Sequence, residues 1–299
     1  MLEKAKKHLP ILLCGPTASG KSKLAMDYAR KTGGIIINAD ALQIYNNWRV
    51  LTARPTQIEE EQVPHFLYGT VSIKEQYSVG HWLRDVKKIL TNFNDTPIII
   101  VGGTGLYFTS LINGLSEIPG IDSHLQAEID NWHSSQGIEK LASWLETHDI
   151  KTFRKIDIRN PARVLRAIEV LKQTGIGLSE WHKKKSKPLV EFREENSFVI
   201  NIEISELNER ISNRFHNMIN NGALDEVTSN KSEWSKTLPG FQAIGAQQLF
   251  QYINNEITFD EATEQSIIRT RQYAKRQRTW FRNKMSDWTK IVNYSSEAI

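Results

Sequence analysis

The sequence predicts an α/β fold in which a parallel sheet is covered by helices and interrupted by a helical insertion. Residues 9–14 and 98–101 are short apolar runs bounded by Pro or Gly, as is typical of strands buried on both faces of a parallel sheet. Helical patterns such as residues 79–92 separate these runs, and strand–helix alternation favours an α/β core. Residues 114–197 are instead charged and helical with little β signal.

We therefore expect residues 1–113 and 198–299 to form one core and residues 114–197 to form a helical insertion domain. Residues 198–204 are apolar and β-branched again, which predicts a strand that rejoins the first sheet. The expected strands are 9–14, 34–38, 98–101 and 198–204, and the expected helices are 21–31, 79–92, 124–148, 161–174, 207–228 and 261–285.

Composition limits the class of protein. The chain has 299 residues, 39% of them hydrophobic and 24% charged, which is ordinary for a soluble globular protein. Its one cysteine, Cys14, permits no internal disulfide framework and is expected to be a small buried core residue. No apolar stretch is long enough to span a membrane. We expect a cytoplasmic monomer.

A phosphate-binding loop follows the first expected strand. Residues 15–22 read GPTASGKS, and this pattern between a strand and a helix is the P-loop signature. Its glycines let backbone N–H groups face phosphate oxygens, Lys21 adds a positive charge, and the Ser22 hydroxyl can hold Mg²⁺. The sequence thus predicts a P-loop NTPase-like core. The residues expected to bind phosphate are Gly15, Pro16, Thr17, Ala18, Ser19, Gly20, Lys21 and Ser22.

Two further strand ends carry polar side chains. Asp40 follows residues 34–38, and Thr104 follows residues 98–101 within GGTGLYF. Because ligands of parallel sheets bind beyond the carboxyl ends of the strands, both should lie beside the P-loop. A carboxylate at Asp40 can serve as a Mg²⁺ ligand, a general base or a cap of a helix N-terminus.

Positive charge is unevenly distributed. The net charge is +4, yet residues 151–193 hold 12 Lys or Arg and only 4 Asp or Glu. Arg163 and Arg166 share one face of an expected helix, and residues 269–284 interleave seven basic side chains with aromatic ones. Such clusters favour a nucleic-acid partner. Solvated basic helix faces over an aromatic core are the alternative explanation.

Taken in order, the motifs resemble those of the tRNA dimethylallyltransferases, also called tRNA isopentenyltransferases. The resemblance spans about residues 10–285 and is most specific in its last two segments. The motifs that carry it are GPTASGKS, NADALQIYNNWRVLTARP, GGTGLYF, NPARVLRAIEV, LPGFQAIGAQQ and TRQYAKRQRTWFR.

The resemblance implies a defined reaction. A dimethylallyl group passes from dimethylallyl diphosphate to N6 of adenine 37 in the anticodon stem-loop of tRNAs that read codons starting with U, and diphosphate leaves. It also implies Mg²⁺ as cofactor and a P-loop that binds the diphosphate of the prenyl donor.

The resemblance also implies roles for single residues. Asp40 matches the catalytic base, Lys21 and Thr104 match other catalytic positions, and Arg210 and Arg214 match arginines near the diphosphate. The residues expected to contact tRNA are Asp40, Ala41, Leu42, Gln43, Thr104, Arg163, Arg166, Lys275, Arg276 and Arg278. Departures from the family pattern at Ala41, Ala246 and Gln247 leave contacts there open.

Two other classes share part of this pattern. A small-molecule kinase would share the P-loop and the sheet, but it would not explain the basic helix at residues 269–284 or the large insertion. A nucleic-acid-binding NTPase without group transfer would usually carry paired carboxylates at a strand end, where this chain offers Asp40 alone. ATP turnover would favour either class over a prenyl transferase.

Overall fold

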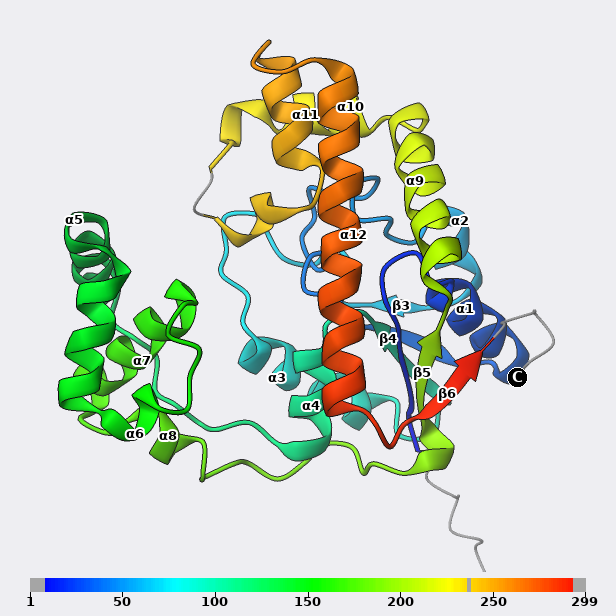
Figure 1. Cartoon of the computed structure of the whole chain (residues 1–299). Helices are drawn as coiled ribbons and strands as arrows, with labels where there is room; N and C mark the ends of the chain where they lie inside the picture. Colours follow the sequence, from blue (N-terminus) through cyan, green and yellow to red (C-terminus); the bar gives the residue numbers. More distant parts are fainter. Residues whose placement is uncertain (1–8, 236–237, 293–299) are drawn as a thin grey trace, which may run out of the picture. The chain divides into compact units, whose positions relative to one another are not determined.

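The computed structural model describes residues 9–235 and 238–292. Within them, six strands form one fully parallel sheet in the order β3-β2-β4-β1-β5-β6 (Figure 1). The strands are β1 (Ile11–Cys14), β2 (Ile35–Asn38), β3 (His65–Phe66), β4 (Ile98–Gly102), β5 (Ser197–Asn201) and β6 (Thr289–Val292). The α/β fold expected from the apolar runs is confirmed.

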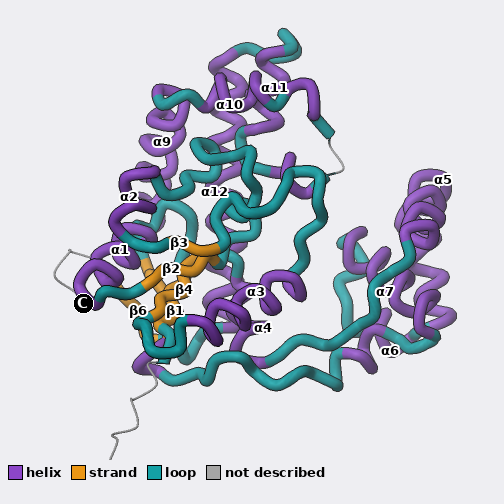
Figure 2. Tube along the Cα trace, turned by 180° about the vertical axis from the view of Figure 1, so that it is seen from behind, coloured by secondary structure: helices purple, strands orange, loops and turns teal. Residues whose placement is uncertain are grey.

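The central strands are buried because their side chains are almost all aliphatic. β1 lies between β4 and β5, with Leu13 in register with Val101 and Phe198. The first helices, α1 (Lys21–Thr32), α2 (Gln57–Gln62), α3 (Val79–Asn92) and α4 (Gly105–Asn113), follow the strands. In both ribbon views α1 lies on one side of the sheet and α3 and α4 lie on the other (Figures 1 and 2). Their apolar side chains therefore cover both faces.

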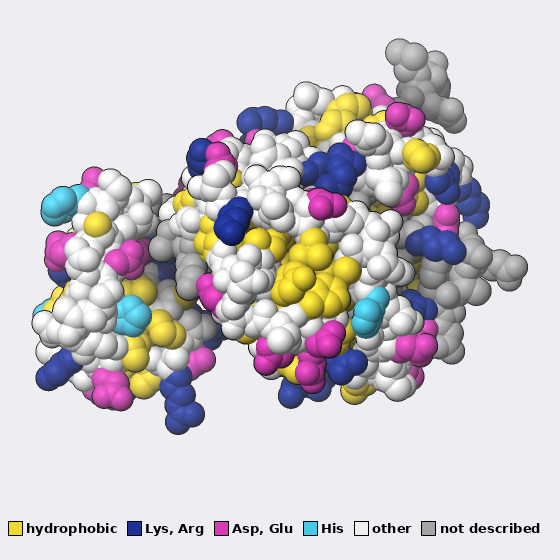
Figure 3. All heavy atoms as spheres, turned by 90° about the horizontal axis from the view of Figure 1, so that it is seen from above, with side chains coloured by type: hydrophobic (Ala, Val, Ile, Leu, Met, Phe, Trp, Pro, Cys, Tyr) yellow, Lys and Arg dark blue, Asp and Glu magenta, His cyan; other side chains and the backbone are white. Residues whose placement is uncertain are grey.

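The last third of the chain adds helices above the sheet. They are α9 (Ile204–Asn220), α10 (Ala223–Ser229), α11 (Ala246–Ile253) and α12 (Phe259–Lys284). The single helix expected at residues 207–228 is wrong, because Gly222 takes a φ of 95° and separates α9 from α10. Phe215, Leu249 and Ala274 meet in one hydrophobic cluster. Seen from above, this end of the core carries a hydrophobic area among charged side chains (Figure 3).

A separate helical unit spans residues 113–188, and the remaining residues form the core unit. Its helices are α5 (Ser123–His148), α6 (Ile150–Phe153), α7 (Pro161–Thr174) and α8 (Leu178–Trp181). Ile129, Leu145 and Ile168 pack in its own hydrophobic cluster. The expected boundary at residue 197 lies too late, because Leu189 donates its backbone N–H to Leu111 of the core (2.9 Å) and belongs to that unit.

Two edge strands, β3 and β6, were not predicted from the sequence. β3 has only two residues, and β6 has mostly exposed side chains, so neither gives the apolar run that marks a buried strand. Among the described residues, no helix is both long and apolar enough to cross a bilayer.

Candidate active site

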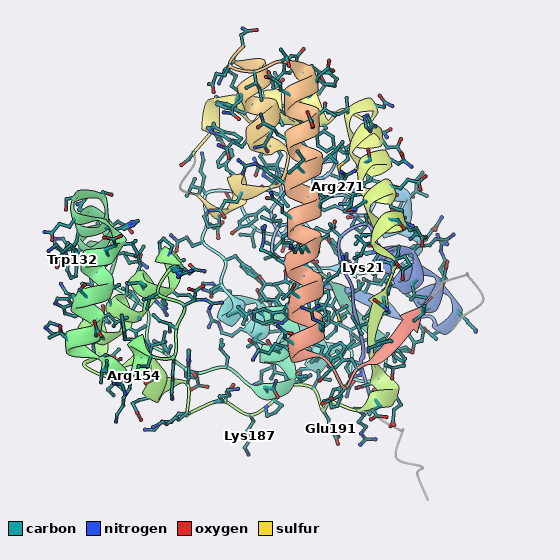
Figure 4. The ribbon with its side chains drawn as sticks, in the orientation of Figure 1. Lys21, Trp132, Arg154, Lys187, Glu191 and Arg271 are labelled. Atoms are coloured by element: carbon teal, nitrogen blue, oxygen red, sulfur yellow. The ribbon has the colours of Figure 1, made fainter. Side chains whose placement is uncertain are left out.

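The P-loop connects β1 to α1 at the carboxyl edge of the sheet. Ala18 and Gly20 both take positive φ values, 62° and 91°, which bends the chain back toward the first turn of α1. Lys21 begins that helix (Figure 4) and donates from Nζ to the carbonyl of Pro16 at 3.2 Å. The carbonyl of Pro16 thus holds the lysine side chain against the loop.

Asp40 lies just past the end of β2, and the buried Asn38 fixes its backbone. The Asn38 side chain accepts from the N–H of Asp40 (2.8 Å) and donates to the Asp40 carbonyl (2.9 Å). One carboxylate oxygen of Asp40 accepts the N–H of Leu42 at 2.9 Å. Asp40 thus caps its own turn through Oδ1, and Oδ2 is the oxygen available to a ligand.

Two polar side chains tie the strand ends together. Thr104 follows β4 and accepts the backbone N–H of Ala41 at its Oγ1 (3.0 Å). Gln277 of α12 accepts the N–H of Thr17 (2.8 Å) and donates to the carbonyl of Gly103 (2.9 Å). The P-loop, the Asp40 turn and the glycine turn after β4 are therefore held in one arrangement before any ligand binds.

A cavity of about 850 Å³ opens between the P-loop, the turn after β2 and helices α9 and α12. Every residue that lines it belongs to the core unit. The polar side chains that line it include those of Thr17, Ser19, Lys21, Ser22, Lys23, Asp40, Gln43, Arg49, Thr52, Arg54, Arg210, Arg214 and Tyr273. Several cations and one carboxylate in the same cavity suit a ligand that carries a polyphosphate and a proton donor.

Two arginines of α9 reach the P-loop. Arg214 donates to the hydroxyl of Thr17 (3.0 Å), and Arg210 donates to the carbonyl of Ser19 (3.4 Å) while pairing with Glu206 (2.5 Å). They lie four residues apart on one helix face. Both guanidinium groups therefore add positive charge to the phosphate side of the cavity.

Charges in the cavity shift one another's ionisation. Desolvation lowers the pKa of Lys21 to about 8, with a further lowering from Arg214 that the opposite charge of Asp40 counteracts. Desolvation also lowers the pKa of Arg214, again against the attraction of Asp40. The pKa of the Tyr273 phenol is raised, first by burial and then by the Asp40 charge. An anionic ligand would relieve the repulsion between the two cations.

Gln43 presents a fixed amide to the cavity. Its Nε2 donates to the carbonyls of Thr52 (2.8 Å) and Ala53 (3.0 Å). Both amide hydrogens are thereby used, so Gln43 can act toward a ligand only as an acceptor through Oε1. An acceptor in this position complements an exocyclic amine, which donates hydrogen bonds.

The structure brings most, but not all, of the expected site residues into the cavity. Lining it are Thr17, Ala18, Ser19, Gly20, Lys21, Ser22, Asp40, Leu42, Gln43, Arg210 and Arg214. Gly15, Pro16, Ala41 and Thr104 are not among the lining residues, and each takes part in a hydrogen bond within the adjoining turns. Thr104 accepts the N–H of Ala41, and its contact with the target nucleotide, implied by the resemblance, stays a prediction.

The basic side chains expected to contact RNA do not line the cavity. Arg163 is exposed on α7 of the helical unit, and Arg166 pairs with Glu169 at 3.3 Å. On α12, Lys275 and Arg276 are exposed. The aromatic residues of α12 do not form an exposed stacking surface: Phe281 is buried and Trp280 packs on Gly105. For Trp280 and Phe281, the alternative explanation therefore applies: these rings pack against the core beneath the basic face of the helix.

Sequence reasoning missed Tyr273 as a cavity residue and Gln277 as the bridge. Both lie within the basic segment, where the charge pattern dominates. Gln277 falls on the same face as Ala274 and Phe281, both buried. A polar residue inside an apolar helical stripe was the available signal, because a buried amide requires hydrogen-bond partners.

A parallel sheet with a P-loop at its carboxyl edge, facing cations and a carboxylate, defines a P-loop fold protein with a polyphosphate site. Comparisons narrow this class. The IPP transferase family model matches residues 43–284, and the isopentenyl transferase model matches residues 10–75. The chain belongs to the IPP transferase family. The small-molecule kinase alternative is thereby set aside.

Individual related proteins support the same family assignment. The chain is 45% identical over 282 residues to a tRNA dimethylallyltransferase of Cereibacter sphaeroides, covering 94% of this chain and 88% of that protein. A solved tRNA isopentenylpyrophosphate transferase of Bacillus halodurans is 30% identical, with a TM-score of 0.66 over 96% of this chain and 90% of that one. A eukaryotic dimethylallyltransferase solved acting on tRNA is 23% identical with a TM-score of 0.79, covers 95% of this chain and 74% of that one, and supports the fold.

Proposed function

We propose that this protein is a tRNA dimethylallyltransferase that alkylates N6 of adenine 37 with the dimethylallyl group of dimethylallyl diphosphate. The observation that carries the proposal is the shared cavity of Asp40, Lys21 and Arg214. N6 attacks C1 of the donor, the C1–O bond breaks, and diphosphate leaves with the electron pair. The displaced N6 proton passes to a carboxylate oxygen of Asp40.

Cations around the P-loop serve the leaving group. Negative charge on diphosphate grows as the C1–O bond breaks, so Lys21, Arg210, Arg214 and the loop amides stabilise the transition state more than the bound substrate. In the free protein, Lys21 donates to the carbonyl of Pro16. We infer that it exchanges this contact for a phosphate oxygen when the donor binds.

The residues present fit a Mg²⁺ ion bound together with the diphosphate. Ser22 follows Lys21 in the first turn of α1 and lines the cavity, as the metal-holding hydroxyl of a P-loop does. Among the described residues, no three His, Cys, Asp or Glu side chains gather into a protein-only metal site. Mg²⁺ commonly takes one or two protein ligands and completes its shell with phosphate and water. When bound, it would neutralise charge on the leaving group.

The acceptor oxygens of Asp40 and Gln43 in the cavity suit an amine. Asp40 Oδ2 can accept one N6 hydrogen, and Gln43 Oε1 can accept the other. An adenine stacked in an anticodon loop cannot reach this depth, so the base must be extruded. A cavity of about 850 Å³ provides room for a flipped base and a five-carbon donor.

Basic side chains outside the cavity suit the phosphates of tRNA. We propose that Arg163 and Arg166 of the helical unit, and Lys275, Arg276 and Arg278 of α12, contact the RNA backbone. We propose that the protein acts as a monomer. A tRNA substrate is consistent with a cytoplasmic location.

One assay tests the proposal. Protein, Mg²⁺, labelled dimethylallyl diphosphate and an anticodon stem-loop with adenines at positions 36 and 37 are incubated without ATP. We expect label in the RNA and release of diphosphate. A stem-loop with guanine at position 37 is the control. Absence of label in the RNA, together with ATP hydrolysis when ATP is supplied, would contradict the proposal.

A further inference from the structure

One wall of the cavity is a short loop held by a carboxylate from another helix. Arg49, Val50 and Leu51 point three consecutive backbone N–H groups at the side chain of Glu226 in α10. Arg49 and Val50 reach Oε1 at 2.5 and 2.9 Å, and Leu51 reaches Oε2 at 2.9 Å. Charge-assisted bonds of this kind are about twice as strong as neutral ones.

The residue that caps the C-terminus of α10 supports the same loop. Asn230, one turn after Glu226, shares a side-chain hydrogen bond with Asn47 and is itself held by the Glu226 carbonyl at 2.8 Å. Ala223 and Val227 of α10 are fully buried in the cluster that also contains Leu51. Because its apolar face is packed in the core, α10 holds Glu226 and Asn230 in fixed positions beside the loop.

Because this loop forms part of the cavity wall, holding the loop in place also fixes that part of the wall. Residues 49–54 all line the cavity. Beyond the three bound N–H groups, the carbonyls of Thr52 and Ala53 accept both amide hydrogens of Gln43. The orientation of Gln43 therefore depends on where the loop holds these two carbonyls, and the loop position depends on Glu226.

We propose that Glu226 is a positioning residue for the transfer reaction. Through the N–H groups of residues 49–51 it fixes the cavity wall that orients Gln43 toward the acceptor amine. This inference rests on the proposed function for its kinetic consequence, but not for its structural one. Glu226 does not line the cavity itself, so it acts only through the loop.

The negative charge is the property that matters. A carboxylate offers two acceptor oxygens and no donor, which matches three converging N–H groups. A glutamine would keep one acceptor and place an NH₂ group against the remaining N–H, so one contact becomes repulsive. Glu226→Gln therefore tests the charge at nearly constant volume. Asp225→Asn is the matched control, because Asp225 is exposed and lies in the same first turn of α10.

The first measurement does not require activity. Hydrogen–deuterium exchange of full-length protein is followed in a peptide covering residues 47–54. We expect Glu226→Gln to speed exchange of the amides of residues 49–51 about tenfold or more, and Asp225→Asn to leave it unchanged. Equal exchange in both variants would overturn the proposal, whatever reaction the protein catalyses.

The second measurement uses labelled transfer to the anticodon stem-loop. We expect Glu226→Gln to lower kcat about 10- to 100-fold, because misplacement by about 1 Å is enough for such a loss. The dissociation constant for dimethylallyl diphosphate without RNA should change less than about threefold, because the P-loop and Gln277 are not in contact with Glu226. A purely structural role would weaken both together and would overturn the proposal.

Glu226→Asp keeps the measurement decisive if the glutamine variant does not fold. Aspartate keeps the charge but is one methylene shorter, so we expect intermediate exchange rates and an intermediate kcat. Wild-type exchange and wild-type kcat in Glu226→Asp would then refute the role of Glu226. Failure of the wild-type protein to transfer label would refute the proposed function instead, and the exchange result would stand by itself.

Discussion

Gln277 and Thr17 are separated by 260 positions in the chain, yet the Gln277 side chain accepts the Thr17 backbone N–H at 2.8 Å. Because the same amide donates to Gly103 at 2.9 Å, α12 fixes the phosphate-binding loop to the turn after β4. Gln277 is 4% exposed. Loss of the Gly103 bond would leave a buried carbonyl without its partner, and loss of the Thr17 bond would leave a partly buried N–H unpaired.

Gln277→Leu should therefore destabilise the protein. The substitution keeps the volume but leaves the Thr17 N–H and the Gly103 carbonyl unpaired, which costs about 2 kcal/mol or more of the free energy of unfolding. Urea denaturation measures this change, and Gln272→Leu on the exposed side of the same helix is the control. Equal midpoints for the two variants would show that the buried bridge contributes nothing.

Binding of the prenyl donor should depend on pH through Lys21. Its pKa in the free protein is about 8, and a bound diphosphate raises it. Below about pH 7 the lysine is charged in both states, so this group gives no pH dependence. Above about pH 8 the free lysine is neutral, binding takes up a proton, and affinity falls by up to about tenfold per pH unit.

Calorimetry at about pH 9 measures this proton uptake. Dimethylallyl diphosphate is titrated without RNA in two buffers of different ionisation enthalpy. Lys21→Arg is the control, because a guanidinium stays charged throughout this range and should abolish the uptake. Proton uptake of the same size in Lys21→Arg would assign the titration to another group.

Asp40→Asn should separate chemistry from donor binding. Asparagine can still accept the Leu42 N–H but cannot take the N6 proton, so we expect the transfer rate to fall about 100- to 10,000-fold. Donor binding at neutral pH should change little. Since the Asp40 charge raises the pKa of Lys21, the pH dependence of donor binding should shift to lower pH. Equal losses in rate and donor affinity would indicate that Asp40 is a metal ligand.

Arg163 and Arg166 should contribute unequally to RNA binding. Arg163 is exposed, whereas Arg166 must give up its ion pair with Glu169 to reach a phosphate. We expect Arg163→Gln to reduce the slope of log affinity against log salt by about one, and Arg166→Gln to reduce it less. Filter binding of the stem-loop between low and physiological salt measures both slopes. An unchanged slope in both variants would exclude this helix face as an RNA contact.

The elements that could be predicted from the sequence are those determined by residues close together in the chain. The run before Cys14 and residues 98–101 marked buried strands because their side chains are aliphatic throughout. The P-loop was readable because glycines and Lys21 stand at fixed spacing. The break at Gly222 was missed, since an amphipathic pattern continues across it even though the backbone takes a positive φ.

What the sequence by itself determined was the parallel sheet, the polyphosphate loop and the family resemblance, because each depends on periodicity or on residues adjacent in the chain. Three contacts were decided by the tertiary structure alone. The Gln277 side chain accepts the Thr17 N–H of the P-loop, Glu226 binds the loop whose carbonyls hold Gln43, and Thr104 accepts the Ala41 N–H. These contacts join segments distant in the chain, and no local pattern of side chains specifies which of them will meet once the helices pack.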